Sequence, residues 1–163
     1  MTCSLVVNSK SGNTRMVSGA IKRALQAAGV EFVHALLGAP YQISGIIQHG
    51  AALGRTIQFP TINLSLAPEQ LVPLYGVYRA KVYLKDGSVW NGVTNIGTKP
   101  TVSNACIPVA ETHLLGFQGD LYGQFCRIEL LDFLRKEQKF SGLDELKAAI
   151  ADNIRTVQAA CKQ

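Results

Sequence analysis

The 163-residue sequence lacks any uninterrupted apolar run of roughly 18 residues, the length that a membrane-spanning helix requires. Its N-terminus also lacks a basic region followed by an apolar core of about 7–15 residues, so we expect no secretory signal. The four cysteines lie far apart and form no C-x-x-C pair, which excludes the usual zinc-ligand spacing. We therefore expect free thiols, a reducing compartment and a cytoplasmic location.

Aromatic residues and clustered charge are also scarce. Aromatic residues make up 7% of the chain, with a single Trp, and the 16 basic residues are scattered although the net charge is +5. A barrel that binds single-stranded nucleic acid would place exposed aromatic residues along a basic groove. We therefore expect neither a nucleic-acid partner nor a membrane partner, and we expect a monomer. The composition, 47% apolar and 17% charged, is that of an ordinary globular protein.

Apolar periodicity predicts helices near both ends of the chain. Residues 14–28 carry a helical apolar stripe that Gly29 can end, and residues 31–37 predict a second, shorter helix. Residues 141–160 predict a C-terminal amphipathic helix, with Ser141 as its N-cap. Its buried stripe is expected to contain five apolar side chains: Leu143, Leu146, Ile150, Ile154 and Val157.

The middle of the chain predicts strands. Short segments rich in Ile, Val, Thr, Tyr and Phe are separated by Gly, Pro and Asn. Residues 77–84 alternate well, and an Asp-Gly turn at 85–88 predicts a hairpin. Several short strands without intervening helices indicate an antiparallel barrel or sandwich. We expect a helical N-terminal arm at residues 1–39 and a barrel with its own closing helix at residues 40–163.

A proline inside a strand-like segment marks the first candidate site. Residues 54–63 read GRTIQFPTIN, and Pro60 can stand only at a strand entry or a sheet edge because it has no N–H group. Thr61 and Asn63 then project to one face, where a hydroxyl and an amide oxygen can ligate Mg²⁺ or bind phosphate. A purely structural strand entry is the alternative. Upstream lie two glycines suited to close backbone approach and one basic side chain: Gly50, Gly54 and Arg55.

Three further segments carry candidate chemistry. Glu111 and His113 share one face of a predicted strand, where Glu111 is either a general base or a solvent-facing side chain. Residues 95–101, NIGTKPT, predict a fixed loop with Lys99 at its tip. Residues 133–140, FLRKEQKF, place two phenylalanines around basic residues, which suits a planar ring and a phosphate or simply an ordinary loop.

Taken in order, these motifs resemble one known family. GRTIQFPTINL, NGVTNIGTKPTV, ETHLLGFQGDLYG and FLRKEQKF follow one another before a closing helix. This series is similar to the riboflavin kinase family, and in particular to the C-terminal kinase module of bacterial bifunctional riboflavin kinase/FAD synthetases. The resemblance covers about residues 38–158 and is specific in its Pro-Thr-x-Asn and Glu-Thr-His elements.

The resemblance implies a mainly β fold, a six-stranded antiparallel Greek-key barrel with a C-terminal helix. It also implies transfer of the ATP γ-phosphate to the riboflavin 5′-hydroxyl, with riboflavin/FMN and ATP/ADP as partners and Mg²⁺ as cofactor. Glu111 corresponds to the general base of the family, and Thr61 and Asn63 correspond to its metal and phosphate ligands. The other positions that match the family's ATP-binding and flavin-binding residues are Gly50, Gly54, Arg55, Leu114 and Tyr122 for the nucleotide and Arg135 and Phe140 for the flavin.

The sequence departs from the family pattern at two positions. Gln58 replaces a usual glycine and Lys136 replaces a usual proline in the flavin-side loop. These changes leave open a non-catalytic flavin or nucleotide sensor on the same barrel. The His-x-Gly-His motif of the adenylyltransferase module does not occur in the chain, so we expect no FAD synthesis. Residues 4–15 resemble the start of a flavodoxin, but no α/β remainder follows, so we interpret the N-terminal arm as a structural remnant.

Overall fold

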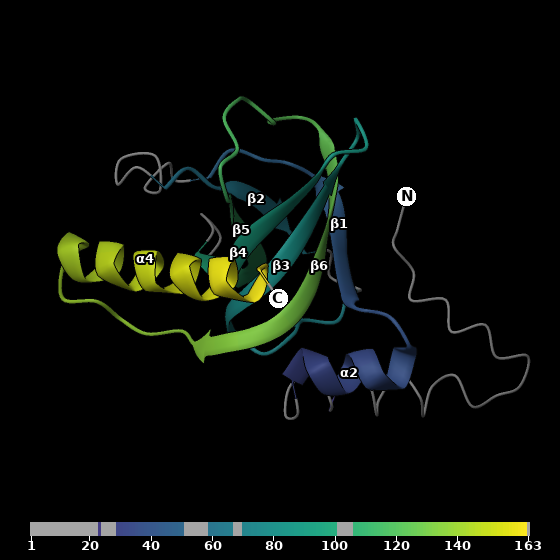
Figure 1. Cartoon of the computed structure of the whole chain (residues 1–163), viewed down its shortest axis with the longest axis horizontal. Coiled ribbons are helices and arrows are strands. Elements are labelled where there is room, and N and C mark those ends of the chain that lie inside the picture. The colour runs from purple at the N-terminus through teal and green to yellow at the C-terminus, as the bar shows by residue number, and fades with distance from the viewer. Residues whose placement is uncertain (1–22, 24–28, 51–58, 67–69, 101–105, 163) are drawn as a thin grey trace, which may run out of the picture.

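A computed structural model describes residues 23, 29–50, 59–66, 70–100 and 106–162 of the chain. Six strands form one antiparallel sheet that curls into a nearly closed barrel, with one short helix before it and one long helix after it (Figure 1). The elements are α2 (Gly29–Leu37), β1 (Tyr41–Ile46), β2 (Ile62–Ser65), β3 (Gly76–Leu84), β4 (Val89–Pro100), β5 (Cys106–Leu114), β6 (Phe125–Lys136) and α4 (Leu143–Ala160). The predicted fold class is confirmed.

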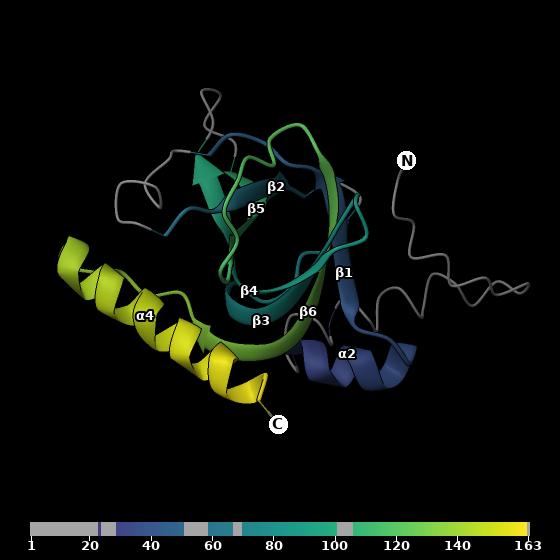
Figure 2. The same ribbon diagram turned by 45° about the horizontal axis from the view of Figure 1, so that its top comes forward.

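The strand order in the sheet is β1-β6-β3-β4-β5-β2. Three consecutive strands, β3 to β5, form a meander, and β6 returns to lie beside β3, which is a Greek key. Figure 2 shows the strands as a ring around the barrel axis. The predicted turn at 85–88 joins β3 to β4, and Gly87 there has a positive φ of 86°. The side chain of Asp86 accepts a hydrogen bond from the Ser88 N–H at 2.9 Å and fixes this turn.

The barrel closes along a narrow seam between β1 and β2. No ladder joins these two strands; the described residues show only an isolated bridge between Gln48 and Asn63. The Gln48 N–H donates to the Asn63 carbonyl oxygen at 2.8 Å. The Ser65 hydroxyl adds a bond to the Gln48 side-chain oxygen, also at 2.8 Å. Backbone closure of the barrel at this seam therefore depends on Asn63.

Apolar side chains from alternate strand positions fill the barrel interior. Ile43, Leu64, Ala80, Ile96 and Ile128, from five different strands, belong to one buried cluster. Polar groups inside the barrel are paired, because Thr94 and Thr112 share a hydrogen bond of 2.8 Å. The Tyr78 hydroxyl donates to the Leu74 carbonyl oxygen at 2.5 Å, and burial raises the pKa of this phenol above its ordinary value. Burial also raises the pKa of the Cys126 thiol, to about 12. The described part of the interior is thus a packed, mainly apolar core.

Helix α4 packs on the outer surface of the barrel. Val157 is fully buried and belongs to a second apolar cluster with Val77 on β3 and Val93 on β4. Two expectations about this helix were wrong. Leu143 is 51% exposed, because the first turn of α4 extends beyond the sheet (Figure 1). The N-cap is Gly142, and the Ser141 N–H and hydroxyl instead both donate to the Glu145 carboxylate at 2.8 Å.

Helix α2 packs against β6 and also contacts β1, the strand that follows it in the chain. Val30 and Val33 are fully buried in the same cluster as the barrel interior. The Glu31 carboxylate accepts a hydrogen bond of 2.6 Å from the Phe133 N–H. The helix predicted at 31–37 is confirmed, starting at Gly29, whereas the helix predicted at 14–28 lies outside the described residues apart from Arg23. No helix among the described residues is long and apolar enough to cross a membrane.

Residues 95–100 are part of a strand, so the loop predicted at NIGTKPT was wrong there. The composition of this segment is typical of a turn, but β4 continues to Pro100 and pairs with β5 down to the contact between Pro100 and Cys106. Tertiary pairing overrides local propensity at this position. Lys99 therefore projects from a paired strand, in register with Ile107, rather than from a loop tip.

Candidate active site

The candidate catalytic carboxylate lies on the outer face of the barrel. Glu111 is on β5 between Ala110 and Thr112, which are both buried. Because successive side chains of a strand point to opposite faces, Glu111 and His113 point outward together, as predicted. Strand pairing places Glu111 directly between Asn63 on β2 and Asn95 on β4. The site is thus built on three adjacent strands.

The Pro-Thr-x-Asn segment meets Glu111, as the family resemblance implied. Pro60 lies two residues before the start of β2, which is the last strand in the sheet order, where a missing N–H costs no ladder bond. The Thr61 hydroxyl donates to the Glu111 carboxylate at 2.7 Å. A bond of 2.9 Å joins the Pro60 carbonyl oxygen to Nδ1 of His113. These two contacts fix the entry to β2 against β5, and they make His113 a structural neighbour of the carboxylate.

Asn63 is held from two sides. Its side chain is only 3% exposed, and the Lys99 ammonium donates to its Oδ1 at 2.5 Å. On the other side, a Cβ atom placed on Gly50 would lie 2.4 Å from the Asn63 Nδ2 atom. Only glycine allows the backbone to come this close to the Asn63 side chain, whereas the predicted contact of Gly50 with ATP stays a prediction. Gly54 and Arg55, predicted beside it, lie outside the described residues, as does Gln58.

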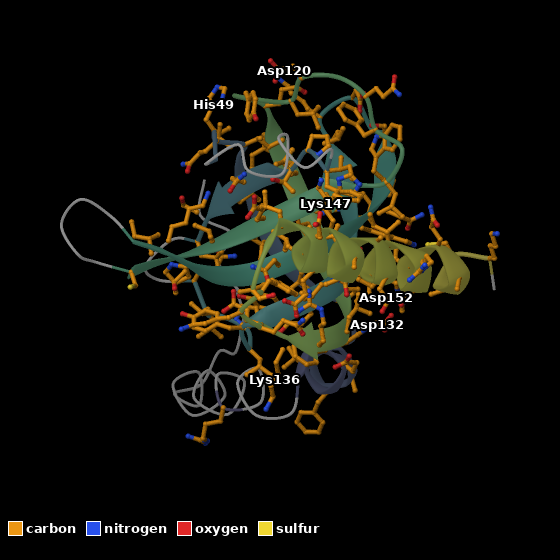
Figure 3. The ribbon with its side chains drawn as sticks, turned by 90° about the vertical axis from the view of Figure 1, so that its left-hand side faces the viewer. His49, Asp120, Asp132, Lys136, Lys147 and Asp152 are labelled. Carbon is orange, nitrogen blue, oxygen red and sulfur yellow. The ribbon has the colours of Figure 1, made fainter. Side chains whose placement is uncertain are left out.

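A shallow pocket of about 190 Å³ opens next to Thr61. Leu114 and Tyr122 both line it, so the structure brings these two predicted residues close to the Pro-Thr-x-Asn segment. The Tyr122 ring stacks on the His49 ring with the centroids 3.7 Å apart. Figure 3 shows His49 and Asp120, another lining residue, at the same end of the barrel. Local sequence patterns could not predict the contact between His49 and Tyr122, because 73 residues separate them.

Arg135, of the other predicted pair, lies on β6 next to its last residue, and Phe140 lies in the segment between β6 and α4. The Arg135 guanidinium lies over the Phe140 ring, 5.7 Å from its centroid. Its Nε donates at 3.2 Å to Oδ1 of Asn153, a buried residue of α4 that the sequence analysis missed. Burial lowers the pKa of Arg135 below its ordinary value. Lys136 is the last residue of β6 and is exposed (Figure 3).

Strand pairing relates this second group to Glu111. Arg135 pairs with Val77, Val77 pairs with Asn95, and Asn95 pairs with Glu111. The two groups therefore lie in one row of the sheet, three strands apart. At about 4.8 Å per strand, roughly 14 Å of curved sheet separates them. The middle of the row is covered, because Val77 is buried in one cluster with Val157 of α4.

Glu137 lies over the middle of the row. The Asn95 amide donates to its carboxylate at 3.3 Å, and a Cβ atom on Gly97 would lie 2.3 Å from the same oxygen. No role was predicted for Glu137 from the sequence. The alternation Asn95-x-Gly97-x-Lys99 on one strand was the available signal, because every second residue of a strand shares a face.

The donor atoms at Glu111 suit a hard cation. A hydroxyl and an amide oxygen are ligands that Mg²⁺ accepts, and Thr61 and Asn63 carry them beside the Glu111 carboxylate. The described residues contain no group of three or more His, Cys, Asp and Glu side chains placed to hold a metal. A magnesium ion here would therefore need further oxygen ligands, such as those of a bound polyphosphate.

Comparisons with known proteins agree with this geometry. A family model described as riboflavin kinase matches residues 37–161. The bifunctional riboflavin kinase/FMN adenylyltransferase of Haemophilus influenzae is 42% identical over 145 residues, which are 89% of this chain and 46% of that protein. The chain thus spans about half the length of this curated relative.

Two solved structures resemble the fold. One, described as a macrolide-efflux protein from Streptococcus pneumoniae, aligns with a TM-score of 0.78 and 29% identity over 86% of this chain and 46% of that chain. A riboflavin kinase from Trypanosoma brucei aligns with a TM-score of 0.53 and 20% identity over 76% of this chain and 81% of that chain, a likeness of fold alone. The family model spans the whole barrel and α4 but only the last residue of α2, and it matches well over half of the chain, so the chain belongs to the riboflavin kinase family.

Proposed function

We propose that this chain transfers the γ-phosphate of ATP to the 5′-hydroxyl of riboflavin, giving FMN and ADP. The observation that carries this proposal is the contact between Thr61 and Glu111, 2.7 Å long, beside Asn63. It places a carboxylate that can accept a proton next to two neutral oxygen ligands for a polyphosphate. Phosphoryl transfer needs mainly this kind of positioning and charge neutralisation.

Glu111 would act as the general base. Its carboxylate is on a strand paired on both sides, so its position is rigid, and the Thr61 hydroxyl orients one of its oxygens. The other oxygen is available to take the proton from a primary alcohol as the alcohol attacks the γ-phosphorus atom. Removal of this proton contributes about 10²–10⁴-fold in comparable enzymes. The ATP β–γ bridge breaks and ADP leaves with the electron pair.

Thr61 and Asn63 would hold Mg²⁺ and the nucleotide phosphates. Bound there, Mg²⁺ would neutralise charge on the transferred phosphoryl group. Gly50, packed against Asn63, with Gly54 and Arg55 would cover the phosphates, and Leu114 and Tyr122 would contact the nucleotide from the adjoining pocket. Arg135 and Phe140 would hold the flavin ring at the other end of the row.

Several expectations from the sequence stay predictions. These are the division into an arm at residues 1–39 and a barrel at residues 40–163, a monomeric state and a cytoplasmic location.

The proposal is tested by incubating the purified protein with riboflavin, ATP and Mg²⁺ and separating the flavins by chromatography. Formation of FMN with equimolar ADP is the expected result. If no FMN forms but calorimetry detects riboflavin or ADP binding, the kinase proposal is wrong and the barrel is a sensor. If neither turnover nor binding is found, both functions are excluded.

Replacing Thr61 with valine should reduce kcat/KM for ATP about 10- to 100-fold. Valine keeps the volume but removes the hydrogen bond to the carboxylate and the hydroxyl ligand, and a bond to a charged group contributes about 1.5–3 kcal/mol. Steady-state kinetics with varied ATP measures the effect. Thr156→Val on the exposed face of α4 is the matched control and should behave as wild type. Full activity in Thr61→Val would remove this residue from the site.

A further inference from the structure

Lys99 is a charged residue beside Asn63 to which the sequence analysis assigned no role. It is on β4, half-buried, and its ammonium crosses the intervening strand β5 to reach Oδ1 of Asn63 at 2.5 Å. The residue is held by strand pairing on the β5 side, in register with Ile107. Its charge is therefore placed by the sheet and not by a free loop.

The charge of Lys99 is not neutralised by a neighbouring acid. Within the described part of the chain, ion pairs join Arg79 to Asp132, Arg127 to Glu129 and Arg155 to Asp152, and Lys99 takes part in none. Its hydrogen-bond partner there is a neutral amide oxygen. A half-buried ammonium with a neutral acceptor gains further stabilisation when an anion binds beside it, because charge-assisted hydrogen bonds are roughly twice as strong as neutral ones.

The same contact fixes the orientation of the Asn63 amide. The whole amide packs against Gly50, where a Cβ atom would come within 2.4 Å of Nδ2 and 2.8 Å of Oδ1, and Oδ1 also accepts the Lys99 ammonium. Asn63 pairs directly with Glu111 on the outer face of the sheet, so the Lys99 ammonium lies beside this pair. Lys99 thus adds a positive charge beside two neutral candidate ligands of the polyphosphate, Thr61 and Asn63.

We propose that Lys99 binds the polyphosphate of the nucleotide. In the absence of nucleotide, its hydrogen bond to Asn63 keeps the ammonium at the site. When nucleotide enters, the ammonium turns from the amide oxygen to a phosphate oxygen, which leaves Asn63 Oδ1 for other ligands. This inference rests on the proposed function for the identity of the ligand, but it concerns binding and not turnover.

The test compares ATP with adenosine, which lacks the phosphates. Lys99→Met keeps the aliphatic stem and removes the charge. We expect its Kd for ATP, measured by calorimetry with Mg²⁺, to rise about 10- to 100-fold, and its Kd for adenosine, measured by NMR titration, to stay within about twofold. Lys99→Arg should retain most of the ATP affinity. Lys81→Met, at an exposed lysine on β3, is the matched control and should bind ATP as the wild type does.

Each other outcome has a distinct meaning. Unchanged ATP affinity in Lys99→Met would overturn the inference, and equal weakening of ATP and adenosine would show a structural role instead. If the wild type binds ATP but forms no FMN, the proposed function is wrong. The role of Lys99 is then still decided by comparing the ATP and adenosine affinities of Lys99→Met with those of the wild type. A wild type that binds no nucleotide would overturn both.

Discussion

Glu111→Gln should lower the turnover of riboflavin to FMN by about 10²- to 10⁴-fold, with little change in ATP affinity. Glutamine has nearly the same shape, and its amide oxygen can still accept the Thr61 hydroxyl, so the hydrogen bond of 2.7 Å can remain. An amide cannot take a proton at neutral pH, however, so the attacking alcohol loses its base. Single-turnover formation of FMN, with ATP binding measured separately, distinguishes the chemical step from binding.

Glu129→Gln is the matched control for this result. Glu129, on β6, is also a strand carboxylate that accepts a hydrogen bond from a hydroxyl group, here that of Tyr83 at 2.8 Å. This control should therefore keep its activity. A Glu111→Gln variant with more than about a tenth of wild-type turnover would show that another group removes the proton, or that proton removal is not required.

Gly76→Ala should destabilise the barrel by about 2–5 kcal/mol. Gly76 has a φ of 151°, which non-glycine residues rarely adopt, and a Cβ atom there would lie 2.4 Å from the Arg135 carbonyl oxygen and 2.6 Å from the Phe133 ring. Strained backbone and overpacking each cost about 1–3 kcal/mol. Because the nearest contact is backbone, it cannot be relieved by turning a side chain. Denaturant unfolding measures the difference.

Gly45→Ala on β1 is the control for this stability prediction. A Cβ atom at Gly45 would lie 3.8 Å from Leu64, an ordinary contact, so we expect a change below about 1 kcal/mol. A similarly small change in Gly76→Ala would contradict the close approach of β3 and β6 at this point. The riboflavin affinity of any folded Gly76→Ala protein is also informative, because the clash would displace Arg135.

The sequence predicted what depends on local periodicity. Alternation at residues 77–84 and the Asp-Gly turn predicted the β3–β4 hairpin, and two-residue spacing predicted that Thr61 and Asn63 serve one face. Their convergence on Glu111 was implied by the family resemblance, and no spacing could show it. It depends on the pairing of β2 with β5, whose residues lie about 50 positions apart along the chain.

The failures of prediction arose from non-local contacts. Lys99 was assigned to a loop because its neighbours are typical turn residues, whereas pairing with β5 keeps it in a strand. Its contact with Asn63 spans 36 residues, and the contact of Asn95 with Glu137 spans 42. Leu143 satisfied the helical stripe but extends past the sheet that the stripe covers. Periodicity identifies which face of an element is apolar, but it does not say where the opposing surface ends.

Because Asn63 lies both at the seam and at the candidate site, ligand binding should affect how often the barrel opens locally at this seam. The Asn63 backbone carbonyl oxygen accepts the hydrogen bond from the Gln48 backbone N–H that closes the barrel between β1 and β2. The side chain of Asn63 is also proposed to bind ligand. An isolated bridge opens more readily than a ladder, so the Gln48 amide should exchange its hydrogen with solvent through local openings. A ligand that binds only the closed seam makes these openings rarer by the factor 1 + [L]/Kd. We therefore expect ligand binding to make local opening of the barrel rarer, although the proposed site lies on the outer face of the barrel.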